Sequence, residues 1–379
     1  MESIISTPKD EPFPYKAYFL EKKEDGKKFV GLFAHEMVPV ELIRASGVHV
    51  VPLVFVGPEE YSSTGGSFIT HSACSFARNI VGGFIHGDIS FYKYIESIIR
   101  TNYCNGDFIG MEYLCREYNM PCIDLSIPMK TQGYSLAFFH EQLKRFKQKL
   151  EDVLAAPIDE AEIRRQISIH NNLRQVLRRL LDLGIRGAEL LHRYQEAAVL
   201  EPAEMIARLD CLYFQEAAQH SPPSSSSSSN PRIMLSGDPI FINDFFGDWL
   251  EEFGATIVYY DTWIGGRMAE FSIDEVDPDV YHALAKGYLM EQGLERSVPA
   301  AMEKRIKRVS SKVGTQKIDG IINHTLKFCD FQAIGRTEFK DRLGQHVPVL
   351  DIERDYAQSN LGNIKTRVEA FIELVKGGA

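Results

Sequence analysis

Three of the six cysteines stand where a helix is expected to begin. Cys74 lies in a polar loop that enters a helix, Cys104 precedes a helix, and Cys329 follows an apolar strand. A helix N-terminus carries partial positive charge and free N–H groups, which favour a thiolate. Thiolates are the ligands of zinc sites and of iron–sulfur clusters. The three residues therefore indicate a metal or cluster site, although long stretches of chain separate them.

Cysteine spacing by itself leaves other interpretations open. The chain has no C-x-x-C pair, so the usual ferredoxin and zinc-ribbon motifs are absent. Free cysteines often pack as small hydrophobic residues. We expect that structural role for Cys115, Cys122 and Cys211, which lie among apolar residues in a helix, a strand and a helix. A cluster-free α/β protein with buried thiols remains an alternative hypothesis.

The composition excludes several classes of protein. The chain has 379 residues, 44% of them hydrophobic and 25% charged, which is typical of a globular protein of two or three domains. Its net charge of −10 argues against a nucleic-acid-binding surface. No apolar run approaches the roughly 18 residues that span a bilayer, and the N-terminus has no signal pattern. We expect a cytoplasmic protein without a membrane partner, in whose compartment disulfides are rare.

The elements expected to position the cysteines are strands that alternate with helices along the chain. The predicted strands are apolar and mostly β-branched, and they cover residues 28–34, 48–56, 121–127, 233–235, 255–260, 318–324 and 347–352. Helical patterns separate many of them, which predicts open, doubly wound parallel sheets of the Rossmann-like or flavodoxin-like kind. Ligands of such sheets bind beyond the carboxyl ends of the strands. Cys329 stands at such an end, and Asp238 and Asp261 at two others could line an interdomain cleft.

Composition along the chain predicts five segments. Leucines at helical spacing, among them Leu173, Leu177 and Leu180, indicate a helical insertion between two α/β domains. Six consecutive serines after it have nothing to bury and predict a linker or loop. The expected segments are an N-terminal stretch at 1–27, a first α/β domain at 28–134, a helical segment at 135–220, the Ser/Pro-rich linker at 221–230 and a second α/β domain at 231–379.

Five short motifs, in order along the chain, resemble one known family. Residues 39–47 are similar to the P-x-E-L-I-x-A-x-G helix in the iron–sulfur subunits of 2-hydroxyacyl-CoA dehydratases and benzoyl-CoA reductases. Residues 74–78 resemble that family's C-S-F/Y-x-R, residues 104–106 its C-D-G, residues 328–330 its F-C-D, and residues 351–356 its closing I-E-x-D segment. The resemblance extends from about Lys28 to the C-terminus. Each motif is weak alone, and the ordered set is fairly specific.

The resemblance implies a 4Fe-4S cluster held by Cys74, Cys104 and Cys329, with the fourth iron open to water, substrate or a bridging sulfide. It also implies a CoA-thioester substrate, an identical or paralogous second subunit in a dimer, and an ATP-dependent activator protein. The activator would supply one electron that forms a ketyl radical on the thioester. A lyase that dehydrates a 2-hydroxyacyl-CoA or an oxidoreductase that reduces an aromatic ring would result. A non-catalytic electron-relay subunit is the alternative.

Two departures from the family pattern matter. Asn105 replaces the usual aspartate after the second cysteine, which could change the local charge and the cluster potential. The strand end at 260–263 has none of the additional cysteines of members with a double cubane, so we expect a single cubane. The chain has neither a P-loop nor a dinucleotide fingerprint, so nothing in it indicates ATP or NAD binding.

Four other residues are candidates for roles in the site. His35 and Glu36 follow the first strand, and the resemblance places their loop near the substrate. Either could act as a catalytic proton donor or base, although Glu36 could instead stabilise the start of the next helix. Ser75 and Arg78 follow Cys74 and could contact cluster sulfide or bind an anionic substrate. A helix-surface position for Arg78 is the alternative.

Overall fold

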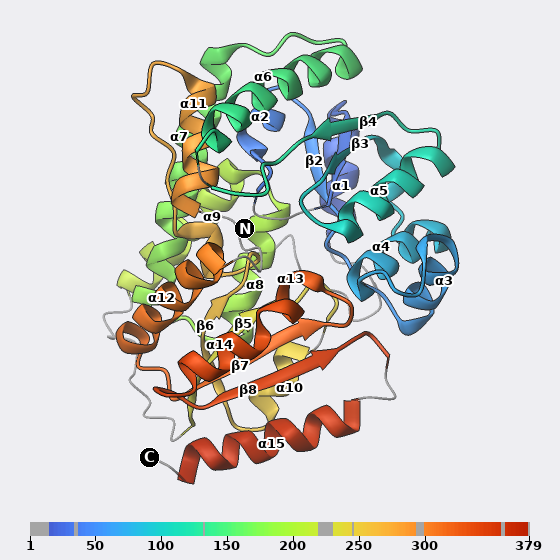
Figure 1. The fold of residues 1–379 in the computed structure, drawn as a ribbon. Helices are drawn as coiled ribbons and strands as arrows, with labels where there is room; N and C mark the ends of the chain where they lie inside the picture. The colour runs from blue at the N-terminus through green and yellow to red at the C-terminus, as the bar shows by residue number, and fades with distance from the viewer. Residues whose placement is uncertain are drawn as a thin grey trace.

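Two four-stranded parallel sheets form the framework of the molecule (Figure 1). The computed structural model describes residues 15–33, 37–131, 133–218, 230–244, 246–292, 299–357 and 361–377. The first sheet has the strand order β2-β1-β3-β4 and the second has the order β6-β5-β7-β8. The predicted fold class, two doubly wound α/β sheets with a helical segment between them, is confirmed. The exact boundaries of the five segments remain a prediction.

Every strand pairs in parallel with its neighbours, as the alternating pattern predicts. The central strands β1 and β7 are buried along their whole length, because helices cover both faces of each sheet. The strands of the first sheet are β1 (Phe29–Leu32), β2 (His49–Pro52), β3 (Ile95–Thr101) and β4 (Cys122–Leu125). Those of the second are β5 (Arg232–Gly237), β6 (Thr256–Asp261), β7 (Gly320–Leu326) and β8 (Val349–Arg354).

The helices around the first sheet include two that the sequence pattern did not predict, α1 and α3. Only Phe19 of α1 is buried, so this helix lacks the periodic apolar face by which an amphipathic helix is recognised in a sequence. Helix α3 contains the run Ser62–Gly66, whose residue types favour loops. The helices of this half are α1 (Lys16–Glu24), α2 (Val40–Arg44), α3 (Glu59–Ile69), α4 (Ser75–His86), η1 (Tyr92–Tyr94) and α5 (Asn105–Glu117).

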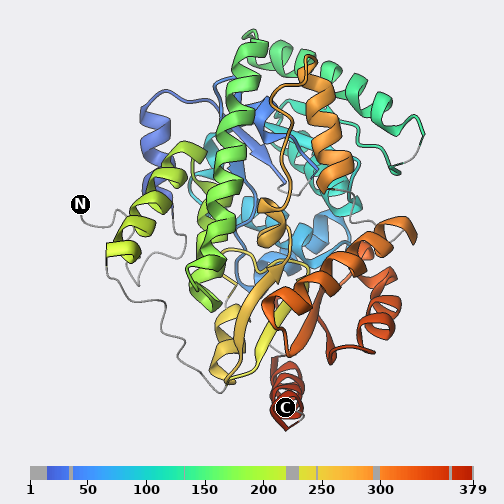
Figure 2. The same ribbon diagram turned by 90° about the vertical axis from the view of Figure 1, so that its left-hand side faces the viewer.

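Four helices form the segment between the sheets: α6 (Ser135–Leu154), α7 (Glu160–Asp182), α8 (Gly187–Val199) and α9 (Pro202–Ala218). Helix α7 is strongly amphipathic, and its start is capped by the Asp159 carboxylate, which accepts from the Ala161 amide. It packs against both α2 and α9. Figure 2 shows this long green helix running alongside both halves of the molecule. The predicted serine-rich linker, residues 221–229, lies outside the described residues.

The helices around the second sheet include two irregular stretches. The helical stretch after Cys329 is interrupted at Gly335, and α11 continues as a π-helix from Gly287. Helix α15 covers β8 at the bottom of Figure 1. The elements are α10 (Phe246–Glu252), η2 (Gly266–Ala269), α11 (Val280–Lys286), η3 (Gly287–Gln292), α12 (Pro299–Gln316), α13 (Asp330–Ile334), α14 (Arg336–Leu343) and α15 (Leu361–Gly377).

The first sheet with its helices forms the first half of the molecule, and the second sheet with its helices forms the second half. One hydrophobic core continues from the first half into the second. The rings of Phe76 in α4 and Phe241 after β5 stack with centroids 3.7 Å apart. Phe55 and Ile242 form an isolated parallel bridge between the halves, and the Val56 amide donates to the Ile242 carbonyl at 3.0 Å. These contacts fix the position of one sheet relative to the other. In the described part of the chain, every helix is too short or too polar to cross a membrane.

Candidate three-cysteine site

Cys74, Cys104 and Cys329 line one cavity of about 530 Å³. Each occupies the position that immediately precedes a helix, namely α4, α5 and α13. The first two cysteines belong to the first half of the molecule and the third belongs to the second half. The cavity therefore lies where the two halves meet, and the fold closes the long sequence separations between the cysteines.

Parallel-sheet geometry explains the convergence. Cys104 follows the carboxyl end of β3, and Cys329 follows the carboxyl end of β7, the edges at which doubly wound folds bind ligands. The Ser75 amide donates to the Lys327 carbonyl at 3.0 Å, which fastens the start of α4 to the loop before Cys329. A Cβ on Gly106 would lie 3.4 Å from Cys74 Cβ, so glycine lets the starts of α4 and α5 approach closely.

Burial sets the ionisation of the thiols. It raises the pKa of Cys104 to about 12. Contact with the Cys74 thiol, reinforced by burial, raises the pKa of Cys329 well above its usual range. The Cys329 thiol donates to Asp238 Oδ1 at 3.3 Å, and burial raises the pKa of that carboxyl to about 6. Cys104 and Cys329 are therefore protonated at neutral pH in the metal-free protein, and binding a metal to them would release protons.

Ser75 and Arg78 flank the cavity without lining it. The Ser75 side chain is completely buried, and its hydroxyl has no hydrogen-bond partner among the described residues. Arg78 Nε donates to the Ala73 carbonyl at 3.1 Å, and its guanidinium lies over the Phe328 ring. Arg78 thus supports the loop before Cys74. The substrate-binding roles predicted for both residues remain predictions.

Several residues that line the site were difficult or impossible to recognise from the sequence pattern. Tyr103 and Phe331 stack at 5.1 Å and form a wall beside the cysteines. Asp238 was recognisable as a strand-end carboxylate, and it lines a smaller inner chamber of about 70 Å³ next to the same thiols. Asp261 instead accepts from Ser236 and Arg308.

His35 and Glu36, the predicted catalytic pair, lie outside the described residues.

A comparison with protein families decides what kind of chain this is. The family model described as 2-hydroxyglutaryl-CoA dehydratase, D-component, matches residues 36–375. The chain belongs to this D-component family. The resemblance drawn from the five motifs is therefore confirmed.

Two relatives agree with this assignment. The protein named "Putative dehydratase subunit YjiM" of Escherichia coli K12 is 24% identical over 372 residues, which cover 94% of each chain. "Lactoyl-CoA dehydratase subunit beta" of Anaerotignum propionicum is 22% identical over 387 residues, which cover 99% of each chain. Both similarities extend over nearly the whole length, so the D-component family accounts for both sheets and for the helices between them.

Members of the D-component family typically bind an iron–sulfur cluster, so the fit of the cavity to one can be tested. No three His, Cys, Asp or Glu side chains in the described ranges are arranged to hold a single metal ion. In a cubane, however, each thiolate binds a different iron, so its ligands lie farther apart. Three thiols around one cavity and the unpartnered Ser75 hydroxyl beside them fit such a cluster.

The remaining cysteines lie outside the cavity. Cys115 is buried and Cys122 is partly buried, and both pack against the core as expected. The prediction of a core thiol is wrong for Cys211, which is exposed on α9. Its apolar neighbours Leu209 and Tyr213 are buried, but Cys211 falls on the opposite side of the helix.

Proposed function

We propose that this chain is the cluster-holding subunit of a cytoplasmic 2-hydroxyacyl-CoA dehydratase or a related reductase. Cys74, Cys104 and Cys329 would hold a 4Fe-4S cluster in the cavity between the two halves. The convergence of these three thiols, from distant parts of the chain, on one cavity is the observation that carries the proposal. When bound, such a cluster supplies one-electron chemistry and an open iron that acts as a Lewis acid.

The protein's own part is to position a thioester and to keep water away from it. The cavity of about 530 Å³ falls within the range of roughly 300 to 1,000 Å³ that small-molecule sites occupy. Its wall of Tyr103 and Phe331 is apolar, which favours desolvation of the reacting group. Phe328 is 46% exposed and Ile334 is 72% exposed, and both present further apolar surface at the cavity. His35 and Glu36 are proposed as proton donor or base.

The proposed enzyme has more than one subunit. One relative is named as a subunit beta, which supports a partner chain for this one. We propose a dimer with an identical or paralogous subunit and an ATP-dependent activator protein as the electron donor. Substrate and partner identity are separate questions from whether this chain holds iron.

Iron analysis tests the proposal directly. The chain, purified without oxygen together with its partner, should contain about four irons and four sulfides per copy, as a cubane requires. Cys329→Ala should lose the visible absorbance of the cluster. Cys211→Ala is the matched control, since this thiol is exposed away from the cavity, and it should retain the absorbance. Wild-type protein without iron, or a Cys329→Ala variant with a full cluster, would contradict the proposal.

A further inference from the structure

Cys115 and Cys122 are in contact at the end of α5 that lies farthest from the cysteine cavity. Cys115 is in the last turn of α5, and Cys122 is the first residue of β4. The Cys115 carbonyl accepts from the Met120 amide at 2.9 Å, which closes the chain between the two cysteines into a tight turn. Helix α5 packs against both β3 and β4 (Figure 1). Within this packing, the Cys115 thiol donates a hydrogen bond to the Cys122 sulfur.

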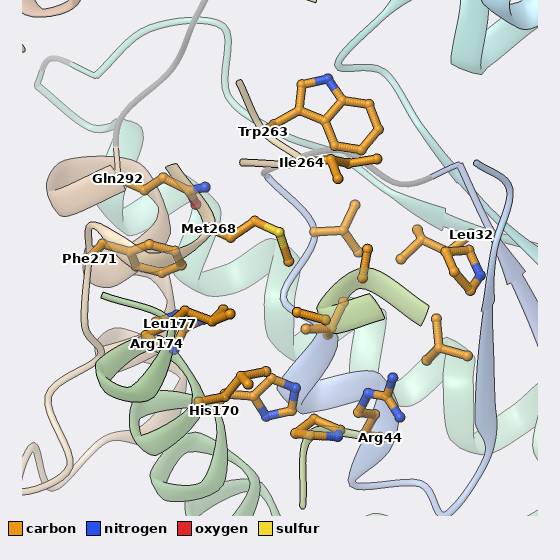
Figure 3. A pocket seen from close by; sticks show the side chains of 18 of the residues that line it. Leu32, Arg44, His170, Arg174, Leu177, Trp263, Ile264, Met268, Phe271 and Gln292 are labelled. Carbon is orange, nitrogen blue, oxygen red and sulfur yellow. The ribbon is translucent and has the colours of Figure 1, made fainter. Parts of the chain in front are cut away.

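This thiol pair is separate from the cavities of the molecule. The cysteines of the proposed cluster site line the large cavity and its inner chamber, and Cys115 and Cys122 line neither. A further cavity, of about 140 Å³, has no cysteine among its described wall residues, which include Trp263 and Met268 (Figure 3). Cys104 and Cys115 stand roughly 16 Å apart along the axis of α5. The chemistry of the pair is therefore independent of the cluster site.

The two thiols of the pair differ in how readily they ionise. The hydrogen bond from Cys115 lowers the pKa of Cys122, and Arg100 in β3 acts in the same direction, whereas burial and Asp124 oppose them. The same hydrogen bond, together with burial, raises the pKa of Cys115. Arg100 is held beside the pair by ion pairs with Asp124, at 2.7 Å, and with Glu112. Cys122 is therefore the thiol that ionises first, and Cys115 keeps its proton.

The exposure of the two thiols follows the same order. Cys122 is partly exposed, whereas Cys115 is buried. The thiolate is the form that attacks peroxides, and redox-active cysteines are accessible and stand beside a second, resolving cysteine. Cys122 has the features of the attacking residue, and Cys115 has those of the resolving residue.

We propose that Cys115 and Cys122 form a peroxide-reactive dithiol, a modification site distinct from the cluster ligands. The Cys122 thiolate attacks one oxygen of hydrogen peroxide and becomes a sulfenic acid, and the hydroxide released takes up the proton that Cys122 gave up. The Cys115 sulfur then attacks the Cys122 sulfur, the S–S bond forms, and the hydroxyl group leaves with the Cys115 proton as water. Two thiols thus lose two electrons, and one peroxide is reduced to two waters.

A small-molecule dithiol would restore the pair by exchange, becoming a disulfide itself. The inference does not rest on the proposed function, because both residues belong to the first half of the molecule and neither is a proposed cluster ligand.

Peptide mapping of the full-length chain, purified without oxygen and then treated with hydrogen peroxide, tests the proposal. Remaining thiols are alkylated before digestion with trypsin, which places Cys115 in peptide 101–116 and Cys122 in peptide 117–130. We expect these two peptides to become linked, and dithiothreitol to separate them again. Fragmentation spectra should assign the bond to Cys115 rather than to Cys104, which lies in the same peptide.

Reaction rates and serine variants assign the two roles. In the wild type, Cys122 should be oxidised about tenfold faster than Cys211, because its pKa is lowered. Cys115→Ser removes the resolving thiol, so dimedone should trap a sulfenic acid on Cys122. Cys211→Ser, which removes an exposed thiol on α9, is the matched control and should form the disulfide at the wild-type rate. The wild-type rates give an answer even if Cys115→Ser folds poorly.

Several outcomes would overturn the inference. Peptides 101–116 and 117–130 that stay unlinked after peroxide would do so, as would a disulfide formed only among Cys74, Cys104 and Cys329. Equal oxidation rates of Cys122 and Cys211 would contradict the activation of Cys122. None of these results depends on iron content, so the failure of this inference is distinguishable from the failure of the proposed function.

Discussion

The Ser75 hydroxyl is a buried polar group without a partner in the described part of the chain. Leaving such a group unsatisfied costs about 1 to 3 kcal/mol, so folded proteins usually avoid it. Ser75 directly follows Cys74, at the first position of α4. A sulfide of a bound cluster would give the hydroxyl its missing acceptor, and this would explain why a serine is tolerated there.

Ser75→Ala separates this explanation from a purely structural one. The metal-free variant should unfold with a free energy equal to or slightly above that of the wild type, because no hydrogen bond is lost. The cluster-loaded variant should have a more negative reduction potential, because donors to the sulfurs stabilise the reduced state. Redox titration followed by electron paramagnetic resonance measures this.

Ser97 provides the matched control. Its hydroxyl is also buried and unpartnered among the described residues, but it lies on β3 and does not line the cysteine cavity. Ser97→Ala should leave the potential where it is. An equal potential in Ser75→Ala and the wild type would rule out a contact between Ser75 and the cluster.

At the scale of elements, the contact between α3 and α4 fixes the position of Cys74. The two helices touch through their backbones: a Cβ on Gly82 would lie 1.9 Å from the Tyr61 carbonyl oxygen, and one on Gly65 would lie 1.9 Å from the Arg78 carbonyl oxygen. Only glycine permits this approach. Because Cys74 precedes α4, any displacement of that helix would move a proposed ligand.

Gly82→Ala should therefore lower the free energy of unfolding by about 3 kcal/mol or more, measured by denaturant titration. Gly110→Ala is the matched control in the neighbouring helix α5. Its new Cβ would meet only Val81 Cγ2 at an ordinary 3.5 Å, and alanine favours helix, so the control should equal or exceed the wild type. If both variants are equally stable, the helices are not in close backbone contact.

The same elements show how far the sequence could predict the fold. The apolar strands and the helical segment were predictable, because buried parallel strands and amphipathic helices leave strong patterns. Helix α3 was not, because its Ser62–Gly66 run disfavours a helix, and its packing, mainly against α4, depends on the rest of the fold. Of the site, the cysteines were predicted from their motifs, whereas the stacking of Tyr103 on Phe331 depends on how the halves meet.

At the scale of the whole molecule, buried charges tie the first half to the helical segment. Glu41 in α2 accepts from Arg174 in α7 and, at 2.7 Å, from the Tyr288 hydroxyl in η3. His170, one turn of α7 before Arg174, is buried beside this network. Breaking such a network from one side leaves an uncompensated buried charge, so the junction should resist opening near neutral pH.

Acid should weaken this junction through His170. Burial, aided by Arg44 and Arg174, lowers its pKa from 6.5 to about 4, although Glu41 acts in the opposite direction. Between these values the unfolded chain binds a proton that the folded protein does not. The free energy of unfolding should therefore fall by about 3 kcal/mol as the pH drops from 6.5 to 4.

Urea unfolding at several pH values across this interval measures how steeply the free energy of unfolding falls with pH. His170→Asn should make this fall less steep by the contribution of one titrating group. The control His346→Asn, at an exposed position, should leave the pH dependence of the unfolding free energy as in the wild type. A His170→Asn variant that loses stability with acid as steeply as the wild type would show that other groups are responsible.

The order of the cysteines along the chain bears on how the protein is made. A ribosome releases Cys74 and Cys104 early, but Cys329 follows β7, an inner strand of the second sheet. The cavity is thus completed only after β7 has been made and has paired with β5. A cluster delivered earlier would meet only two of its three proposed thiol ligands, and premature termination before residue 329 would leave a chain unable to complete the site.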